Sequence, residues 1–448
     1  MERSNIPSSG GGGCDLISNM PDPILHHILG LLKTREAVQT CVLSKRWVHL
    51  WTCLPSLDFD SIEFTALEHP QCDSEEEESN VQRARDSLRF STFVTTMLLM
   101  RKPLHLDMFR VSFGSLISDN LLLKEWVIYA LQQNPRAVHL EFLKYPPLSL
   151  IHRLYACASL EELSIHYGAG RVSPRLAEEL YLHHSERAFS KYTRRAAINL
   201  PNLKKLSFLN GSFSKNKLKD LLSSCPLLQY LSLEQCYLEE DEIAHETLQH
   251  LTTINCRIPS IISATNLVTF YCISPEQIAT PNMPSLTHAC VSVTDNIPMI
   301  GSWEGLASFF SGLVNVEVLE LDVPYAKPQE EYVLPELPIF QKVHDFSVGF
   351  CMCSGFLFWL VTWILKKVPN LKKLTLKQQK CYGFCCGEEA DRSDWIDVPL
   401  RAAISHCNNL EVVEVKYSRS DSTLKRLLDA LVDGTIELQN VNIMLSKH

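Results

Sequence analysis

Apolar residues recur along most of the chain with the spacing L-x-x-L-x-L, in which other aliphatic or aromatic residues replace some leucines. The last two apolar positions lie two residues apart, so on a strand both point to one face and the residue between them points to the other. The clearest copies are Leu160/Leu163/Ile165, Leu203/Leu206/Phe208, Leu228/Leu231/Leu233, Val316/Leu319/Leu321 and Leu371/Leu374/Leu376. Weaker copies are Leu106/Phe109/Val111, Leu248/Leu251/Thr253, Leu267/Phe270/Cys272, Leu286/Ala289/Val291, Val343/Phe346/Val348, Leu410/Val413/Val415 and Leu438/Val441/Ile443.

The period of this motif predicts the fold of the larger part of the chain. From Leu203 to Val343 the intervals between first positions are 25, 20, 19, 19, 30 and 27 residues, the range of leucine-rich repeats. We therefore expect an α/β fold in which the repeats form a curved solenoid with a parallel sheet on its concave face. Helices or loops, such as the one expected around Leu218, Leu221 and Leu222, would return the chain on the convex side.

The N-terminal stretch Asp15–Asp60 has a different pattern, with helical rather than strand spacing. Ile24, Leu25, Ile28, Leu29 and Leu32 fall on one face of a helix expected from about Asp22. A second helix is expected to follow with Thr34 as its N-cap, and a third short helix would carry two tryptophans. So few residues rarely form a sufficient core alone, so we expect these helices to dock onto something else.

This stretch resembles the F-box, in the form common in plants. The residues that carry the resemblance are Asp15-Leu16-Ile17-Ser18, Met20-Pro21-Asp22, Ile28-Leu29, Ala37-Val38-Gln39-Thr40, Val42-Leu43-Ser44-Lys45-Arg46-Trp47, Leu50-Trp51 and Leu54-Pro55. Met20 stands where leucine is usual. The resemblance implies binding to a Skp-type adaptor, which would join the chain to a cullin-RING ubiquitin ligase. The adaptor-binding residues it implies are Met20, Pro21, Ile24, Leu25, Ile28, Leu29, Val38, Val42, Leu43, Trp47 and Trp51.

The two patterns suggest a domain organisation. We expect a disordered N-terminus over residues 1–14, an F-box over 15–60, an acidic linker over 61–80, a repeat solenoid over 81–395 and a terminal cap over 396–448. The run Glu75–Glu78 favours a solvated loop. Through Trp395–Pro399, Cys407–Lys416 and Leu424–Met444, the C-terminal part loosely resembles the FBD region that follows leucine-rich repeats in many plant F-box proteins. Two irregular insertions, at 171–195 and 381–397, are candidate specificity elements because such insertions gather on one rim.

The residues between the motif leucines should line the concave face and contact a protein substrate. The candidates are Ser207, Ser232, Tyr271, Glu320, Thr375 and Glu414. On this hypothesis the chain is the substrate-recognition subunit of a Skp-cullin-F-box ubiquitin ligase, acts by proximity and is not itself an enzyme. Two alternatives remain open. One is a hormone-like co-receptor within the same ligase, and the other is an adaptor-binding scaffold that delivers nothing for degradation.

Composition and motifs exclude several other functions. The net charge of -9 provides no electrostatic footprint for nucleic acid. The 16 cysteines are dispersed without zinc-ligand spacing, so we expect no metal site, and no cofactor is expected either. We expect free thiols in a reducing compartment, namely the nucleus, the cytoplasm or both. Cys236 and Cys256 each follow a motif copy by three residues, where a buried structural cysteine is typical. No P-loop, nucleophile elbow, dinucleotide fingerprint or H-E-x-x-H motif is present.

One uncharged segment, Phe346–Leu365, is long enough to span a bilayer. Phe346 and Val348, however, fit the repeat, so the segment is interpreted as a strand followed by a buried convex helix. No membrane partner is therefore expected.

Overall fold

The computed structural model describes residues 17, 20–65, 76–113, 120–142, 148–168, 198–213, 215–239, 242–256, 261–273, 282–292, 309–323, 338–350, 363–378, 404, 407–417 and 442–447. Its contacts divide the chain into two units, Met1–His139 and Leu140–His448, each of which has its own core. The predicted insertions at 171–195 and 381–397 and the disordered N-terminus at 1–14 lie outside the described residues.

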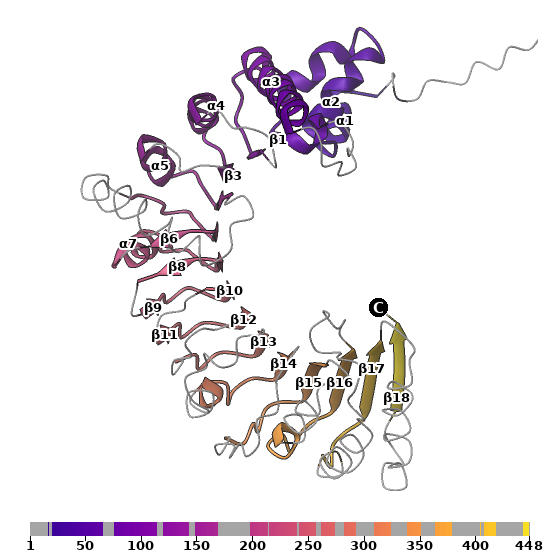
Figure 1. Cartoon of the computed structure of the whole chain (residues 1–448), viewed down its shortest axis with the longest axis vertical. Coiled ribbons are helices and arrows are strands. Elements are labelled where there is room, and N and C mark those ends of the chain that lie inside the picture. The colour runs from indigo at the N-terminus through magenta and orange to yellow at the C-terminus, as the bar shows by residue number, and fades with distance from the viewer. Residues whose placement is uncertain are drawn as a thin grey trace, which may run out of the picture. The chain divides into compact units, whose positions relative to one another are not determined.

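Unit 1 begins with short helices and continues into two repeats of strand and helix (Figure 1). Its elements are α1 (Asp22–Gly30), α2 (Thr34–Gln39), η1 (Thr40–Val42), η2 (Trp47–Cys53), β1 (Ser56–Asp60), η3 (Ser61–Phe64), α3 (Glu76–Met100), β2 (Met108–Ser112) and α4 (Asn120–Gln132). β3 (Ala137–Phe142) contains the division between the units. β1 pairs with β2 in parallel, Leu57 opposite Phe109, so the end of the predicted F-box is already a strand of the repeat sheet.

Local interactions explain where the first helices begin. Pro21 precedes α1 in an extended conformation, and a second proline in the first turn needs no N–H partner there. Lys33, not Thr34, occupies the N-cap of α2, and its backbone N–H donates to the side chain of Glu36 at 3.3 Å. The prediction for Thr34 is therefore wrong. Its hydroxyl is buried and accepts a hydrogen bond from the N–H of Asp58 at 2.7 Å, which joins α2 to β1.

Two further predictions for unit 1 need correction. The predicted third helix is a 3-10 helix, η2, which begins at Trp47. The predicted solvated loop at the run Glu75–Glu78, near the end of the acidic linker, is wrong, because α3 begins at Glu76 inside this run. Carboxylates near a helix N-terminus interact favourably with the helix dipole, so an acidic run can also mark a helix start.

Unit 2 consists of repeated strands with short helices between some of them. Its elements are α5 (Leu148–Tyr155), β4 (Glu162–Tyr167), β5 (Lys205–Leu209), β6 (Ser212–Phe213), α7 (Lys217–Ser223), β7 (Tyr230–Glu234), β8 (Tyr237–Leu238), β9 (Glu242–Ala244), β10 (His250–Ile254), β11 (Ile261–Ser263), β12 (Thr269–Ile273), β13 (His288–Ser292), β14 (Val318–Val323), β15 (Asp345–Phe350), β16 (Lys373–Gln378), β17 (Val412–Tyr417) and β18 (Asn442–Lys447). The longer strands from β4 to β18 follow chain order in one sheet, whereas β6 with β8 and β9 with β11 form two small sheets.

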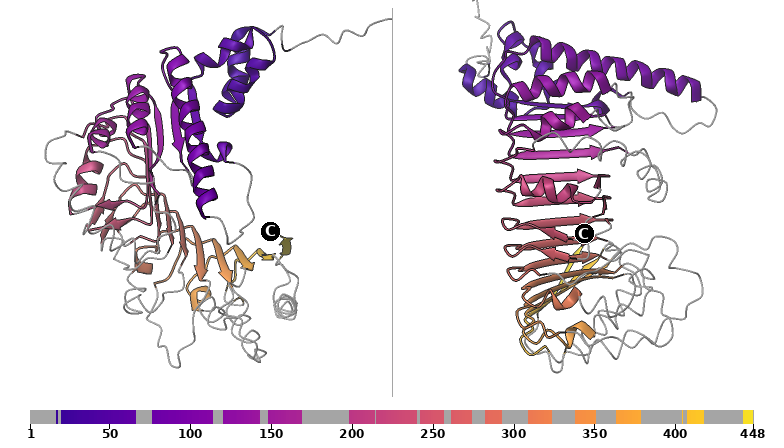
Figure 2. Two further views of the ribbon diagram at one scale, coloured as in Figure 1. Left: turned by 45° about the horizontal axis from the view of Figure 1, so that its top comes forward. Right: turned by 90° about the vertical axis from the view of Figure 1, so that its left-hand side faces the viewer.

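The motif leucines form the core of unit 2. Along β5, β7, β10 and β12 buried and partly exposed residues alternate, and each strand pairs in parallel with the next without a register shift. Each apolar pair is thus stacked on the next pair, which buries a continuous apolar layer. The two views of Figure 2 show these strands side by side, and Figure 1 shows α5 and α7 on one side of them. The opposite side of the sheet is here named the sheet face.

Two turns that follow strands carry the cysteines that the motif predicts. Asn210, Gln235 and Asn255 have positive φ, and Cys236 and Cys256 directly follow Gln235 and Asn255. The Cys236 N–H donates to the Cys256 sulfur at 3.3 Å, and the Cys256 thiol donates to the carbonyl of Leu233 at 3.1 Å. Both cysteines are buried, which confirms their predicted structural position.

The end of the repeat array departs from the predicted register. Ile443 pairs opposite Val413 and Leu445 opposite Val415, so the last copy is shifted by two residues from Leu438/Val441/Ile443. The strand predicted at Phe346 and Val348 is confirmed as β15. Residues 351–362 lie outside the described part, and within the part that the structure describes no helix has the length and apolarity needed to cross a membrane.

Candidate interaction surfaces

The helices of unit 1 expose apolar side chains that a folded domain usually buries. The exposed fraction is 84% for Val42, 63% for Leu43 and 75% for Leu31. Ile24, Leu32 and Val48 are also exposed. These residues come from α1, the turn after it, η1 and its C-cap, and η2, and η2 contacts both α1 and η1. Solvent-exposed apolar residues gathered on a small domain are typical of a protein-binding surface. We name Ile24, Leu31, Leu32, Val42, Leu43 and Val48 the helical apolar surface.

Other residues predicted to bind the adaptor lie inside unit 1. Leu25 and Leu29 are fully buried, and Trp47 and Trp51 are 3% and 6% exposed. In this arrangement these four side chains cannot be inserted into a partner, so their predicted contact with the adaptor is corrected to a supporting role in the core. Of the remaining predicted residues, Pro21, Ile24, Val42 and Leu43 are exposed, and Met20, Ile28 and Val38 are partly exposed.

The side chain of Arg46 holds the start of α1 beside the start of η2. Its guanidinium donates to the Asp22 carboxylate, from Nε at 3.1 Å and from Nη2 at 2.5 Å, and to the carbonyl of Met20 at 2.5 Å. The start of α1 is thereby joined to the residue before η2. Both N–H groups donate to the same carboxylate oxygen, Oδ1, and the ion pair is partly exposed, so it should contribute about 1 kcal/mol or less to stability.

The sheet face of unit 2 brings the predicted substrate residues into one row. Ser207 lies opposite Ser232, and the row then continues through Tyr271, Glu320 and Thr375 to Glu414. The row also contains residues that the prediction missed, namely Ser164, Thr252, Cys290 and Ser347, although each lies between motif apolar residues in the same way. Thr375 is 3% exposed, so its position is as predicted but its side chain is covered.

Two carboxylates of this row form ion pairs with lysines that lie beside the row. Lys377 on β16 pairs with Glu320 on β14, and between these strands the residue opposite Lys377 is Gly349, which has no side chain in the way. Further along, Lys373 lies 3.1 Å and Lys416 3.6 Å from the carboxylate of Glu414. Burial alone would raise the pKa of Glu414, but the two lysines and the Ser446 hydroxyl lower it, so this carboxylate is ionised.

Aromatic side chains lie on the same face toward its N-terminal strands. The rings of Tyr230 on β7 and His250 on β10 are stacked, with centroids 4.2 Å apart and an angle of 9° between their planes. Lys205 on β5 places its Nζ 5.7 Å from the centroid of Tyr230 and 3.4 Å from Glu162. Sequence reasoning missed these positions because they precede the first buried leucine of each strand, where the motif assigns no role.

Within the described residues no grouping of three or more His, Cys, Asp or Glu side chains could hold a metal ion. Five further cysteines lie outside these residues, namely Cys351, Cys353, Cys381, Cys385 and Cys386.

Comparison with known proteins identifies two segments of this chain. The model of the F-box domain matches residues 17–58, and the model described as the leucine-rich repeats of the FBD-associated F-box protein At5g56370 matches residues 140–289. The first match covers the helical apolar surface and its supporting core. The second covers the strands from β4 to β12 and the start of β13, which carry the first half of the sheet face.

Similar proteins in Arabidopsis thaliana align with this chain over most of their length. The F-box protein At4g27050 is 25% identical over 92% of this chain and 89% of its own length. The F-box/FBD/LRR-repeat protein At5g22660 is 24% identical over 91% and 85%, and the FBD-associated F-box protein At4g10400 is 26% identical over 81% and 77%. The chain thus contains an F-box followed by leucine-rich repeats, as the resemblance of its N-terminal stretch and the period of its apolar motif predicted.

Proposed function

We propose that this F-box protein with leucine-rich repeats is a substrate receptor of a Skp-cullin-F-box ubiquitin ligase. The exposed apolar side chains of Val42, Leu43 and Leu31, within the segment that matches the F-box model, carry this proposal. Burying such side chains against an apolar partner would release about 1.5–3 kcal/mol for each fully covered residue. The partner with the matching chemistry is a Skp-type adaptor.

The repeats would perform the second half of the function. The sheet face carries a row of polar and aromatic side chains on a parallel sheet, most of them partly exposed, which suits the binding of a polypeptide target. The chain would then raise the effective concentration of a substrate lysine near the ubiquitin-charged enzyme, without a covalent step of its own.

Adaptor binding tests the first half. The full chain is co-purified with a Skp-type adaptor, wild type beside Val42→Asp and Leu43→Asp. A carboxylate at either position would be buried without a partner, so we expect at least tenfold weaker binding. Leu121→Asp is the matched control, because Leu121 is 72% exposed but lies on α4 and outside the segment that matches the F-box.

Circular dichroism establishes that each variant is folded. A folded wild-type chain that does not bind the adaptor would refute the proposal, as would equal losses for Leu43→Asp and Leu121→Asp. Proteins captured by the wild-type chain should gain ubiquitin in the reconstituted ligase and should not do so with Leu43→Asp.

A further inference from the structure

We propose that the middle of the sheet face, from β7 to β14, binds an arginine-containing basic segment of the substrate polypeptide. This inference rests on the proposed function and names the chemical class of the target. We name the site, formed by Tyr230, Glu234, His250, Tyr271, Glu320 and Asp322, the aromatic-acidic site.

Aromatic rings occupy three neighbouring strands of this region. Tyr230 and His250 form the stacked pair on β7 and β10, and Tyr271 follows on β12. Tyr230 is 40% exposed, and Lys205 already lies over its ring. Burial lowers the pKa of His250, so near neutral pH its ring is uncharged and does not repel a cation. The position of Lys205 shows that such a ring attracts a positive group, and Tyr271 offers a further ring on the neighbouring strand.

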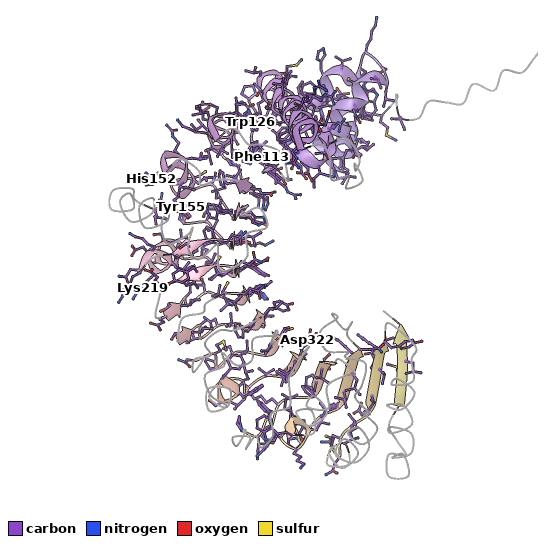
Figure 3. All side chains as sticks on the ribbon, viewed as in Figure 1. Phe113, Trp126, His152, Tyr155, Lys219 and Asp322 are labelled. Atoms are coloured by element: carbon purple, nitrogen blue, oxygen red, sulfur yellow. The ribbon has the colours of Figure 1, made fainter. Side chains whose placement is uncertain are left out.

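Carboxylates stand on both sides of Tyr271. Glu234 is on β7, two strands away in one direction, and Glu320 and Asp322 are on β14, two strands away in the other. With strands about 4.8 Å apart, each lies about 10 Å along the sheet from β12. Burial raises the pKa of Tyr271, and Cys290, Asp322, Glu320 and Glu234 raise it further, as a negative field would. Figure 3 shows Asp322 on the side of the strands opposite α7.

A buried hydroxyl on the same face indicates a ligand that carries a hydrogen-bond donor. Ser347, opposite Glu320 in the register, is 7% exposed, and within the described part of the chain its hydroxyl has no hydrogen-bond partner. Lys377 reaches Glu320 across β15, the strand that carries Ser347. A ligand cation that replaces Lys377 on Glu320 would bring N–H donors to the Ser347 oxygen. In the free chain, Lys377 thus occupies the place on Glu320 that the bound cation would take.

Arginine satisfies all these features together. Its planar guanidinium stacks on aromatic rings, binds a carboxylate through two parallel N–H donors and has further donors for a hydroxyl. Lysine offers a point charge without the planar face. An acidic or phosphorylated segment would be repelled by the three carboxylates.

The test measures fluorescence anisotropy with a short labelled peptide of repeated Arg-Gly-Ser triplets, beside matched Lys-Gly-Ser and Glu-Gly-Ser peptides, and with the full chain. We expect the arginine peptide to bind most tightly, and Tyr271→Ala and Glu320→Gln each to weaken it by about tenfold. Tyr271→Phe keeps the ring and should bind within about twofold of wild type. Glu242→Gln, an exposed carboxylate on β9 outside the main sheet, is the matched control and should change nothing.

The inference is overturned if the arginine peptide binds no better than the glutamate peptide, or if Glu242→Gln weakens binding as much as Glu320→Gln. Adaptor binding of the same samples separates the two proposals. A chain that binds the adaptor but not the arginine peptide refutes this inference alone. A chain that binds the arginine peptide through Tyr271 but not the adaptor refutes the proposed function and leaves the peptide site standing.

Discussion

Arg101 donates two hydrogen bonds to the backbone carbonyl of Leu54, from Nε at 3.3 Å and from Nη2 at 3.0 Å. The same guanidinium donates to the carbonyls of Leu104 and His105, and the residue is 5% exposed. Leu54 is the C-cap of η2, and Arg101 directly follows α3. A single buried side chain therefore joins the end of the F-box helices to the first repeat of unit 1.

Arg101→Lys should lower the free energy of unfolding of unit 1 by about 2–4 kcal/mol, because an ammonium cannot satisfy this spread of carbonyls and would be buried with fewer partners. Four of the seven tryptophans belong to unit 2, so amide hydrogen exchange of peptides from residues 20–139, measured across a urea series, reports on unit 1. Arg89→Lys keeps the charge of a 68% exposed side chain whose buried partner, Asp86, also accepts from Gln82 at 2.8 Å, so it should cost less than about 0.5 kcal/mol. Equal effects of the two changes would contradict the structural role of Arg101.

The turn at Gln235 predicts a stabilising substitution. Gln235 is exposed and has φ of 51°, a left-handed conformation that costs a non-glycine residue about 1–2 kcal/mol. Gln235→Gly should raise the free energy of unfolding by about 0.5–1 kcal/mol, after its larger loss of chain entropy is included. Gln249→Gly, an exposed position before β10 without positive φ, should instead be neutral or destabilising. Thermal denaturation of both variants measures the difference, and destabilisation by Gln235→Gly would refute it.

Cys272 predicts how stability depends on pH. The thiol is fully buried on β12, and burial raises its pKa to about 12. The native thiol keeps its proton while the unfolded thiol loses it above its ordinary pKa, so the free energy of unfolding falls as pH rises from about 9 toward 12. One such group contributes at most about 1.4 kcal/mol per pH unit.

Urea denaturation across this alkaline range measures the slope. In Cys272→Ala this thiol no longer contributes, so the free energy of unfolding should fall less steeply with pH. The variant should also be less stable at every pH, because the substitution leaves a small cavity. An unchanged slope in the variant would show that this thiol ionises as readily in the native state as in the unfolded state.

Much of the repeat region could be predicted because each strand repeats one local rule. The alternation of apolar positions at Leu231 and Leu233, or Leu374 and Leu376, depends only on which face of the strand is buried. For the same reason the six predicted substrate residues fall on one row of the sheet face. The rule failed at β3, where Pro135 occupies the first position that leucine usually fills, so the strand carrying Val138 and Leu140 went unrecognised.

The helical apolar surface was harder to predict because the sequence shows helical periodicity but not which apolar side faces inward. Leu25 and Leu29 share a helical face with Leu32, yet the first two are buried and Leu32 is exposed. The difference arises from packing against η2 and from the end of α1 at Gly30, neither of which is visible in the spacing. The internal pairing of Glu320 with Lys377, 57 residues apart, likewise depends on the number of strands between them.

Trp47 separates the structural interpretation from the sequence-based one most sharply. The sequence predicts it as an adaptor contact, whereas its side chain is 3% exposed in the core of unit 1. Trp47→Ala should therefore lower the free energy of unfolding by about 3–5 kcal/mol, the usual cost of removing a buried tryptophan. Val48→Ala, at a 39% exposed neighbour, should cost less than about 1 kcal/mol. Urea denaturation followed by circular dichroism gives both values, and adaptor titration at low urea shows whether the folded fraction of Trp47→Ala still binds. If Trp47→Ala keeps wild-type stability but binds the adaptor at least tenfold more weakly, Trp47 is a direct contact and the core placement is wrong.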